Sequence, residues 1–457
     1  MNIISINPAT EEINSMFPEE SDDVIEYKLK LAESAFEKWR VLDIKERLKF
    51  LLNFINILQK NREEYAKIIV REVGKTIVSA RAEIDKCIAL ANYYYKNGEL
   101  FLSNKNVQLT DSNKKAEIRF DPLGPILGIV SWNFPFWLPI RFIVPTILAG
   151  NTVLLKHSSS TPLCSIAIED LFKESGYSEG VFQNLLVTSK KINQIIVDDR
   201  IQGINFVGGL EAGSKVASEA GKYIKKLVLE LGGSDPFIVL EDANINKSVT
   251  NLIQGRLRNA GQACNSPKRV IVHKNILDTF IEKVLNNISK VKQGDPMNEE
   301  IDIGPMANLK TLQEVQEQIN KSLSLGADLI YGGQRLDRKG YFLQPAVITN
   351  VKPGMPLFDE EVFGPVIVLT SFDTVEQAIT LSNKSKFGLG ASIWTEDVNL
   401  AVSLIPQVNS GNVYINQLVR SELELPFGGI QKSGFGRELG EYGIKEFVNI
   451  KSVVISD

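Results

Sequence analysis

Apolar residues recur at helical spacing through the first hundred residues of the chain. Leu48, Leu51 and Ile55 fall on one helical face, and Ile84 and Cys87 fall on another. The pattern predicts consecutive helices up to about residue 98. Cys87 lies on the apolar stripe of its helix, so we expect a core thiol there rather than a reactive one.

Short apolar runs separated by amphipathic segments follow after residue 124. The runs predicted to be strands are 126–130, 152–155, 182–187, 203–207 and 226–229. Strands that alternate with helices over this length predict a parallel sheet covered on both faces. A second alternation begins at Phe237 and continues to Ile415, which predicts a second domain of the same kind.

Two further segments fit neither domain. The polar stretch from Ser103 to Ile118 predicts an exposed hairpin or arm. The apolar run 451–455 would be a hazardous exposed edge by itself, so we expect it to pair with this arm or with another subunit. The expected fold class is therefore α/β, with two doubly wound parallel-sheet domains and a small β arm and tail.

Composition narrows the classes of function. The 457 residues are 44% hydrophobic and 23% charged, with a net charge of −4, as in ordinary globular proteins. No local basic patch favours nucleic-acid binding, and no apolar run approaches a membrane span of about 18 residues. The first residues do not resemble a secretory signal, and the three cysteines are widely spaced. A cytoplasmic enzyme with neither disulfides nor a metal site is therefore expected.

One cysteine stands in an unusual setting. Cys264 follows Gly261-Gln262, comes after two arginines and precedes Pro267. A thiol attacks as the thiolate and must be reachable, and a nearby glycine lets the backbone approach a substrate closely. From these residues alone, a nucleophile and a buried structural cysteine are equally good interpretations.

Three other positions suit chemistry. Glu230 ends an apolar strand between two leucines, where poor solvation would raise its pKa and suit a general base; a glutamate that caps the next turn is the alternative. Asn133, between aromatic residues and a proline, is either a rigid donor for an oxyanion or a turn former. Gly208 and Gly209 follow a strand and open a helix, which suits a pyrophosphate but is a weak signal alone.

The order and spacing of these motifs resemble the aldehyde dehydrogenase superfamily over essentially the whole chain. The motifs that carry the resemblance are Asn7-Pro8-Ala9-Thr10, Asn133, Lys156, the glycine turn at 208, Glu230-Leu-Gly-Gly, Gly261-Gln-Ala-Cys264, Glu360-Glu-Val-Phe-Gly-Pro365 and Pro426-Phe-Gly-Gly429. The resemblance implies a dinucleotide-binding domain at 1–102 and 121–231 and a catalytic domain at 232–430. It also implies an oligomerisation arm and tail at 103–120 and 431–457, in a homodimer or homotetramer.

The same resemblance implies roles for the residues. Cys264 is the implied nucleophile, Glu230 the base, and the Asn133 amide with the Cys264 backbone N–H the oxyanion hole. The residues implied to hold NAD(P) are Lys156 and Ser159 at the adenosine ribose, Gly208 and Gly209 at the pyrophosphate, Glu361 at the nicotinamide ribose, and Trp132 and Phe363 nearby. The implied reaction oxidises a small-molecule aldehyde to the carboxylic acid, through a thiohemiacetal and a thioester on Cys264.

Two positions depart from the pattern of this family. Many NAD-specific members have a glutamate where this chain has Ser159, and a negative charge there would repel a 2′-phosphate. We therefore expect NADP to be accepted, and a preference for NADP over NAD stays open because serine also tolerates NAD. A lysine often found nine residues after the oxyanion asparagine is replaced by Phe142, which weakens a proton-relay role for Glu438.

Two arginines bear on the substrate. Arg141 and Arg258 stand where succinate-semialdehyde dehydrogenases hold the substrate carboxylate, and a guanidinium can grip a carboxylate with a bidentate fork. An internal ion pair is the alternative for either one. The third member of that clamp, a serine in relatives, is Glu422 here, which would oppose a carboxylate. Trp137 and Phe136 are expected as apolar walls of the substrate tunnel, and Phe427 as a further substrate-binding residue.

Other functions remain open from the sequence. A broad-specificity or aliphatic aldehyde dehydrogenase is the main enzymatic alternative to succinate semialdehyde oxidation. A coenzyme-A-acylating reaction is less favoured because Glu230 is present to activate water. A catalytically retired structural member is a remote alternative, because the cysteine, base, amide and cofactor glutamate are all present.

Overall fold

The first of two large sheets is built around β5 (Pro125–Ile129), a strand whose five residues are all buried. In the computed structural model, which describes residues 2–456, the strand order of this sheet is β19-β9-β8-β5-β6-β7. The other members are β6 (Thr152–Lys156), β7 (Phe182–Asn184), β8 (Gly203–Val207), β9 (Lys226–Glu230) and β19 (Gly434–Phe435). All pair in parallel except β19, which is antiparallel to β9.

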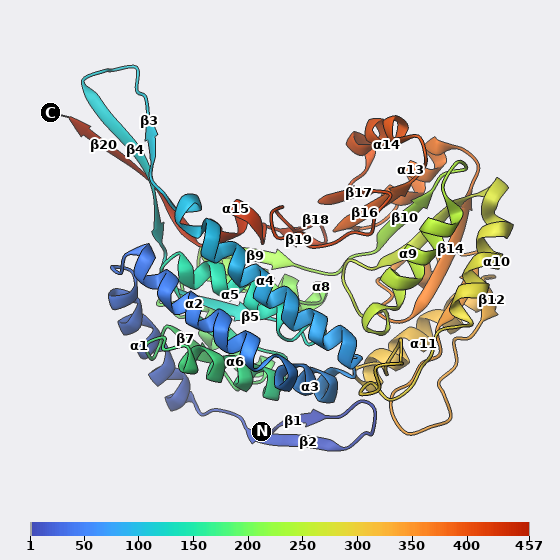
Figure 1. Ribbon diagram of the computed structural model, residues 1–457, viewed down its shortest axis with the longest axis horizontal. Coiled ribbons are helices and arrows are strands. Elements are labelled where there is room, and N and C mark those ends of the chain that lie inside the picture. The colour runs from blue at the N-terminus through green and yellow to red at the C-terminus, as the bar shows by residue number, and fades with distance from the viewer. Residues whose placement is uncertain (1, 457) are drawn as a thin grey trace.

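Helices cover both faces of this sheet, as the sequence predicted (Figure 1). They are α1 (Asp22–Trp39), α2 (Ile44–Lys60), α3 (Arg62–Val73), α4 (Ile77–Phe101), α5 (Trp137–Leu148), α6 (Pro162–Glu174), α7 (Ile192–Ile196) and α8 (Leu210–Lys222), with a 3-10 turn at Ser189–Lys191. Every residue of α5 is buried, because this helix lies between the sheet and the α2–α4 layer. Cys87 is fully buried in the same core, as predicted.

The second sheet has seven strands in the order β12-β13-β14-β11-β10-β16-β17. Its strands are β10 (Asp235–Val239), β11 (Pro267–His273), β12 (Asp328–Tyr331), β13 (Ala346–Thr349), β14 (Val366–Phe372), β16 (Gly390–Trp394) and β17 (Asn412–Ile415). Only the edge strand β12 is antiparallel to its neighbour. The predicted boundary at residues 231 and 232 falls in the link between β9 and β10, which belong to different sheets.

The helices of this second half pack on both faces of its sheet. They are α9 (Ile245–Leu257), α10 (Leu277–Ile288), α11 (Leu309–Ser324), α12 (Pro356–Asp359), α13 (Val375–Asn383) and α14 (Val398–Leu404), with 3-10 turns η2 (Arg258–Gly261), η3 (Lys274–Ile276) and η4 (Ile405–Gln407). A separate two-stranded antiparallel sheet consists of β15 (Phe387–Gly388) and β18 (Ile430–Gln431). Strand and helix alternate as predicted, so the α/β fold class is confirmed.

A three-stranded sheet projects from the body (Figure 1). It consists of β3 (Lys105–Val107), β4 (Lys114–Pro122) and β20 (Val448–Ser456), and β20 pairs with β4 over nine residues. The expected pairing of tail with arm is therefore confirmed. The rest of the predicted tail lies in the body, because β19 joins the first sheet and α15 (Gly440–Ile444) packs on α5. The hairpin β1 (Asn2–Ile6) and β2 (Ile13–Pro18) at the N-terminus was not predicted.

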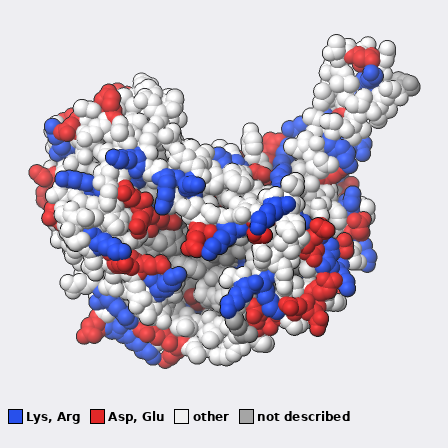
Figure 2. Space-filling view, turned by 180° about the vertical axis from the view of Figure 1, so that it is seen from behind, with Lys and Arg blue, Asp and Glu red and all other residues white. Residues whose placement is uncertain are grey.

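The surface carries both signs of charge. Lysine and arginine are interspersed with aspartate and glutamate over the face in Figure 2, in keeping with the net charge of −4. Among residues 2–456, no helix is both long enough and apolar enough to cross a membrane. The described chain likewise holds no group of three metal-ligating side chains.

Candidate active site

The nucleophile candidate is presented by a left-handed stretch of backbone. Asn259, Ala260 and Gly261, at the end of η2, have φ values of 51°, 53° and 74°. A Cβ on Gly261 would lie 2.1 Å from the carbonyl oxygen of Gly364, so only glycine fits there. An alanine in the left-handed region costs roughly 1–3 kcal/mol. This strain lies at the turn that brings Cys264 to the border of two adjoining cavities.

The thiol of Cys264 is half-buried, and its pKa is raised to about 11. Burial is the largest cause, and the negative charge of Glu230 adds to it. The positive charges of Lys268 and Arg141 act in the opposite direction. The two cationic side chains are therefore the groups that favour the thiolate.

The predicted base lies in a buried charge network. Glu230 is 3% exposed, and its Oε2 is 2.9 Å from Nη2 of Arg141. The same guanidinium also pairs closely with Glu438, whose Oε1 accepts a hydrogen bond from Asn205. One cation thus faces two carboxylates. Burial first, and the charge of Glu438 after it, raise the pKa of Glu230 to about 8, although Arg141 opposes this.

The remaining oxygen of this base is free to act. Oε1 of Glu230 is buried and has no hydrogen-bond partner within the described chain. Glu230 lines the same cavity as Cys264. A carboxylate with one oxygen anchored on an arginine and the other without a partner, in the lining of a cavity that also contains a thiol, suits proton abstraction from water.

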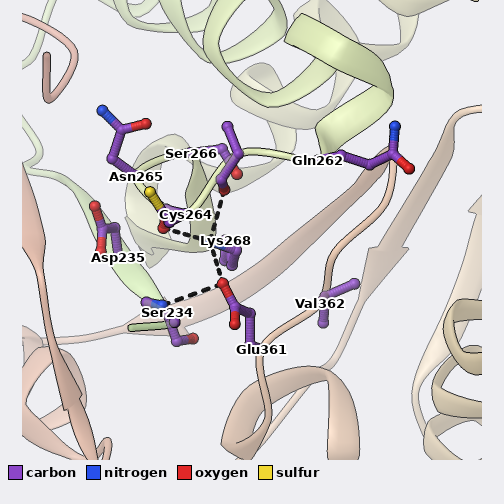
Figure 3. Close-up of polar contacts among 12 residues, drawn as sticks. Ser234, Asp235, Gln262, Cys264, Asn265, Ser266, Lys268, Glu361 and Val362 are labelled. Atoms are coloured by element: carbon purple, nitrogen blue, oxygen red, sulfur yellow. Dashed lines mark hydrogen bonds and ion pairs between the residues drawn. The ribbon is translucent and has the colours of Figure 1, made fainter. Parts of the chain in front are cut away.

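A buried lysine ties the nucleophile loop to the predicted ribose-binding glutamate. Nζ of Lys268 donates to the carbonyl oxygens of Ala263 at 2.9 Å and Cys264 at 2.6 Å, and it lies 3.2 Å from Oε1 of Glu361 (Figure 3). The backbone N–H of Gly233 donates to the same carboxylate at 3.1 Å. These contacts hold Glu361 beside the cavity of Cys264.

The amide of Asn133 has a defined orientation. Its Oδ1 accepts a hydrogen bond of 2.7 Å from the Ser131 hydroxyl, so its NH₂ group points the other way and donates to the carbonyl oxygen of Gln262 at 3.1 Å. An amide has two N–H donors, and this one lies in the lining of the cavity that contains Cys264. The second donor is the one suited to an oxyanion.

A long cleft runs along the carboxyl ends of the first sheet, where open α/β folds bind ligands. One cavity, of about 560 Å³, extends from Lys156 to Gly208 and Gly209, and a second continues from these glycines to Cys264. Gly209 is the N-cap of α8, and a Cβ added there would meet no atom within 4 Å. Backbone N–H groups at a helix start beside open space fit a pyrophosphate.

The nicotinamide end of the cleft also fits the predicted residues. Glu361 and Phe363 line the cavity of Cys264, and the ring of Phe363 packs edge-on against Trp132 with centroids 5.7 Å apart. A Cβ on Gly232 would lie 2.1 Å from Oε2 of Glu361, so the glycine makes room for the carboxylate. The residues present therefore fit a nicotinamide dinucleotide.

The adenosine end differs from expectation in one residue. Ser158 lines the cleft beside Lys156, whereas Ser159 does not. The carbonyl of Ser158 accepts a hydrogen bond of 3.1 Å from the N–H of Thr161, which closes a turn that contains Ser159. The structure also brings Lys215, from α8, into the lining.

A separate cavity of about 220 Å³ reaches Cys264 from the other side. The predicted substrate residues Trp137, Phe427, Arg141 and Arg258 line it. The predicted tunnel residue Phe136 does not, because its side chain is fully buried in the core. Arg141 is 2% exposed and carries two carboxylate partners. This arrangement favours the internal ion pair that the sequence left as the alternative for Arg141, and it leaves Arg258 as the arginine available to a substrate.

Sequence reasoning missed several polar residues of the site. Lys268 lies four residues after Cys264 and was a nearby signal. Ser158 adjoins the predicted Ser159. Lys215 carries no motif, and neither does Lys86, which reaches the separate cavity of about 220 Å³ from α4.

Comparison with known proteins agrees with this geometry. A model of the aldehyde dehydrogenase family matches residues 1–453. A probable NADP(+) succinate-semialdehyde dehydrogenase of Synechocystis is 41% identical over 456 residues, which cover 100% of both chains. An Escherichia coli succinate semialdehyde dehydrogenase named for NAD(P)+ is 41% identical over 450 residues, covering 98% of this chain and 97% of that one.

A solved structure shares the whole fold. The succinic semialdehyde dehydrogenase of Streptococcus pyogenes, in complex with NADP+, superimposes with a TM-score of 0.97 at 35% identity and covers 99% of this chain and 100% of that one. The likeness extends over both sheets and the arm.

Proposed function

Because the chain belongs to the aldehyde dehydrogenase family, we propose that it oxidises succinate semialdehyde, or a similar short aldehyde with a distal carboxylate, to the acid. The observation that carries the proposal is the position of Cys264 between two cavities. One is continuous with the dinucleotide cleft, and the other is lined by basic side chains. The relatives named above act on this substrate according to their names.

The first chemical step belongs to Cys264. Its thiolate adds to the aldehyde carbon, and the charge that develops on oxygen is met by the Asn133 amide and the Cys264 backbone N–H. A bound NAD(P) supplies the hydride acceptor at the Glu361 side of the cavity. Cleavage of the C–H bond with loss of hydride to that acceptor restores the C=O bond and leaves a thioester on Cys264.

The second step belongs to Glu230. Its unpartnered Oε1 takes a proton from water, the hydroxide attacks the thioester carbon, and the C–S bond breaks to release the carboxylic acid and the Cys264 thiolate. Arg141 holds the other oxygen of Glu230, so it orients the base. In this role Arg141 contacts the base and does not contact the substrate.

The adenosine end of the cleft supports NADP, with NAD tolerated. Lys156, Ser158 and Lys215 supply cationic or hydroxyl groups to a 2′-phosphate. One carboxylate, Glu219, also lines this cleft and is paired with Lys222 at 2.5 Å, and Lys215 is itself paired with Glu211 at 2.7 Å. The Lys215–Glu211 pair is exposed and therefore weak, so the two lysines of the lining still favour the phosphorylated cofactor.

Initial rates with succinate semialdehyde and with butanal, each with NAD and with NADP, test the proposal. We expect a higher kcat/KM for succinate semialdehyde, a lower KM for NADP, and no activity in Cys264→Ser. Equal kcat/KM for the two aldehydes would instead support a broad-specificity enzyme. Thioester formation that requires coenzyme A would support the acylating reaction.

The arm supports a homodimer or homotetramer. β20 is an edge strand of nine residues, and its exposed apolar side chains include Ile450, Val454 and Ile455. Such an edge is a template for pairing with another chain. Light scattering of the purified protein measures the number of subunits.

We place the enzyme in the cytoplasm, since a nucleophilic thiol must stay reduced.

A further inference from the structure

The cavity on the substrate side of Cys264 is unusually rich in positive charge. Its cationic lining residues are Lys75, Lys86, Arg141 and Arg258, and its one lining carboxylate is Glu83. Lys75 and Arg141 are buried, whereas Lys86 is half-buried and Arg258 is exposed. Only a buried charge needs a partner within the protein. The partners of each cation therefore show which of them remain available to a ligand.

Two of the four cations are satisfied by the protein itself. Lys75 forms a close buried ion pair with Glu83, whose Oε1 also accepts the backbone N–H groups of Phe136 and Trp137 at 2.9 and 3.0 Å. This carboxylate is consequently fully used. Arg141 faces the two carboxylates of its buried network.

The other two cations have no carboxylate partner. Within the described chain, neither Lys86 nor Arg258 lies in an ion pair with an acidic side chain, and Nη2 of Arg258 donates only to the amide oxygen of Asn265 at 3.0 Å. The guanidinium of Arg258 lies 5.5 Å from the ring centre of Phe134. The direct contacts of both cations at the cavity are therefore with neutral groups.

Lys86 is held in place by neutral contacts. It lies one helical turn after Glu83 on α4, so both side chains face the cavity. Its Nζ donates to the hydroxyl of Ser421 at 2.5 Å and lies 4.2 Å above the ring centre of Trp137. An ammonium has three donors, so two remain for an anion in the cavity.

We propose that Lys86 is a specificity-determining residue that binds the distal carboxylate of the aldehyde, together with Arg258. The inference rests on the proposed function, and it assigns to Lys86 the carboxylate-binding role that the sequence analysis predicted for Arg141. The planar fork of Arg258 and the point charge of Lys86 approach the carboxylate from different elements, η2 and α4. The substrate carboxylate would be the negatively charged partner that neither cation has within the described chain.

The charges around Lys86 support this assignment. Burial, then the positive charges of Arg258 and Arg141, lower the pKa of Lys86 to about 7, while Glu422 and Cys87 raise it. Lys75 and Glu83 face the same cavity as a neutral pair. A bound carboxylate stabilises the ammonium form, so binding takes up a proton above about pH 7. We expect the KM for the carboxylated aldehyde to rise with pH from there, and the KM for butanal to stay constant.

The decisive experiment compares Lys86→Gln with Lys86→Arg and with a control, Lys96→Gln, at an exposed lysine of the same helix. Loss of a charge-assisted hydrogen bond corresponds to about a 10- to 100-fold rise in KM for succinate semialdehyde. We expect this rise for Lys86→Gln, with kcat and the KM for butanal nearly unchanged. Lys86→Arg should restore most of the affinity, and Lys96→Gln should match the wild type.

Other results would overturn the proposal. An equal rise in KM for both aldehydes, or an unchanged KM for succinate semialdehyde in a Lys86→Gln variant whose melting temperature matches wild type, would show that Lys86 does not bind the carboxylate. In either case, a wild-type preference for succinate semialdehyde over butanal would still support the proposed function. A wild type without that preference would instead refute the proposed function.

Discussion

The raised pKa of Cys264 makes a quantitative prediction about the free enzyme. With a pKa of about 11, about one thiol in a thousand is ionised at pH 8, against about a quarter for an ordinary cysteine with a pKa of ~8.5. Alkylation by iodoacetamide should therefore be about two hundred times slower than for free cysteine. Cys87 and Cys164 are fully buried, so the label reports on Cys264.

Glu230→Gln is the perturbation that separates burial from charge. The carboxylate of Glu230 raises the pKa of the thiol only when it is ionised, which is above its own pKa of about 8. An interaction of about 1 kcal/mol changes ionisation about fivefold. We expect Glu230→Gln to be alkylated roughly five times faster than wild type at pH 9.5. The two rates should converge below about pH 7, where Glu230 is neutral.

Mass spectrometry of the intact, cofactor-free protein at a series of pH values gives these rates. Cys264→Ser measures any background label, and a separate unfolding curve shows whether the variant is folded. A wild-type rate that reaches its plateau near pH 8.5 would refute the raised pKa. Parallel profiles for wild type and Glu230→Gln from pH 6 to pH 10 would refute the electrostatic coupling and leave burial as the cause.

Three further predictions concern the charged residues of the site. Glu438→Gln removes a negative charge that raises the pKa of Glu230, so the pH at which kcat reaches half its maximum should fall below its wild-type value; an unmoved pH–rate profile of kcat would contradict this. Lys268→Met leaves two buried carbonyls and Glu361 without their cation, and should lower the free energy of unfolding by about 3 kcal/mol; urea denaturation checks this, and a loss below about 1 kcal/mol would show that the ion pair is dispensable. Lys215→Ala should raise the KM for NADP several-fold and leave the KM for NAD unchanged, and an equal change in both values would show that Lys215 does not contact the 2′-phosphate.

The sequence by itself predicted the architecture, which the structure confirms, and predicted three residues that the structure brings to one cavity. Helical periodicity and short apolar runs predict elements that the structure contains, because each pattern reflects burial of one face or of both faces of a strand. The predicted Cys264, Glu230 and Asn133 line one cavity, since β5 and β9 end at the same edge of the sheet. Patterns that depend on neighbours in sequence, or on the ends of parallel strands, can be interpreted without coordinates.

Only the tertiary structure decided which charged side chains are already paired within the protein and which can bind a ligand. The sequence predicted the same carboxylate-binding role for Arg141 and Arg258. Packing, however, places two carboxylates against Arg141 and none against Arg258. Lys86 reaches the cavity from a helix far from Cys264 in sequence. Ion pairing and burial are set by residues that long-range folding brings within about 4 Å. The identity of a charged residue therefore predicts its chemistry, and its neighbours in space decide whether that chemistry is available to a substrate.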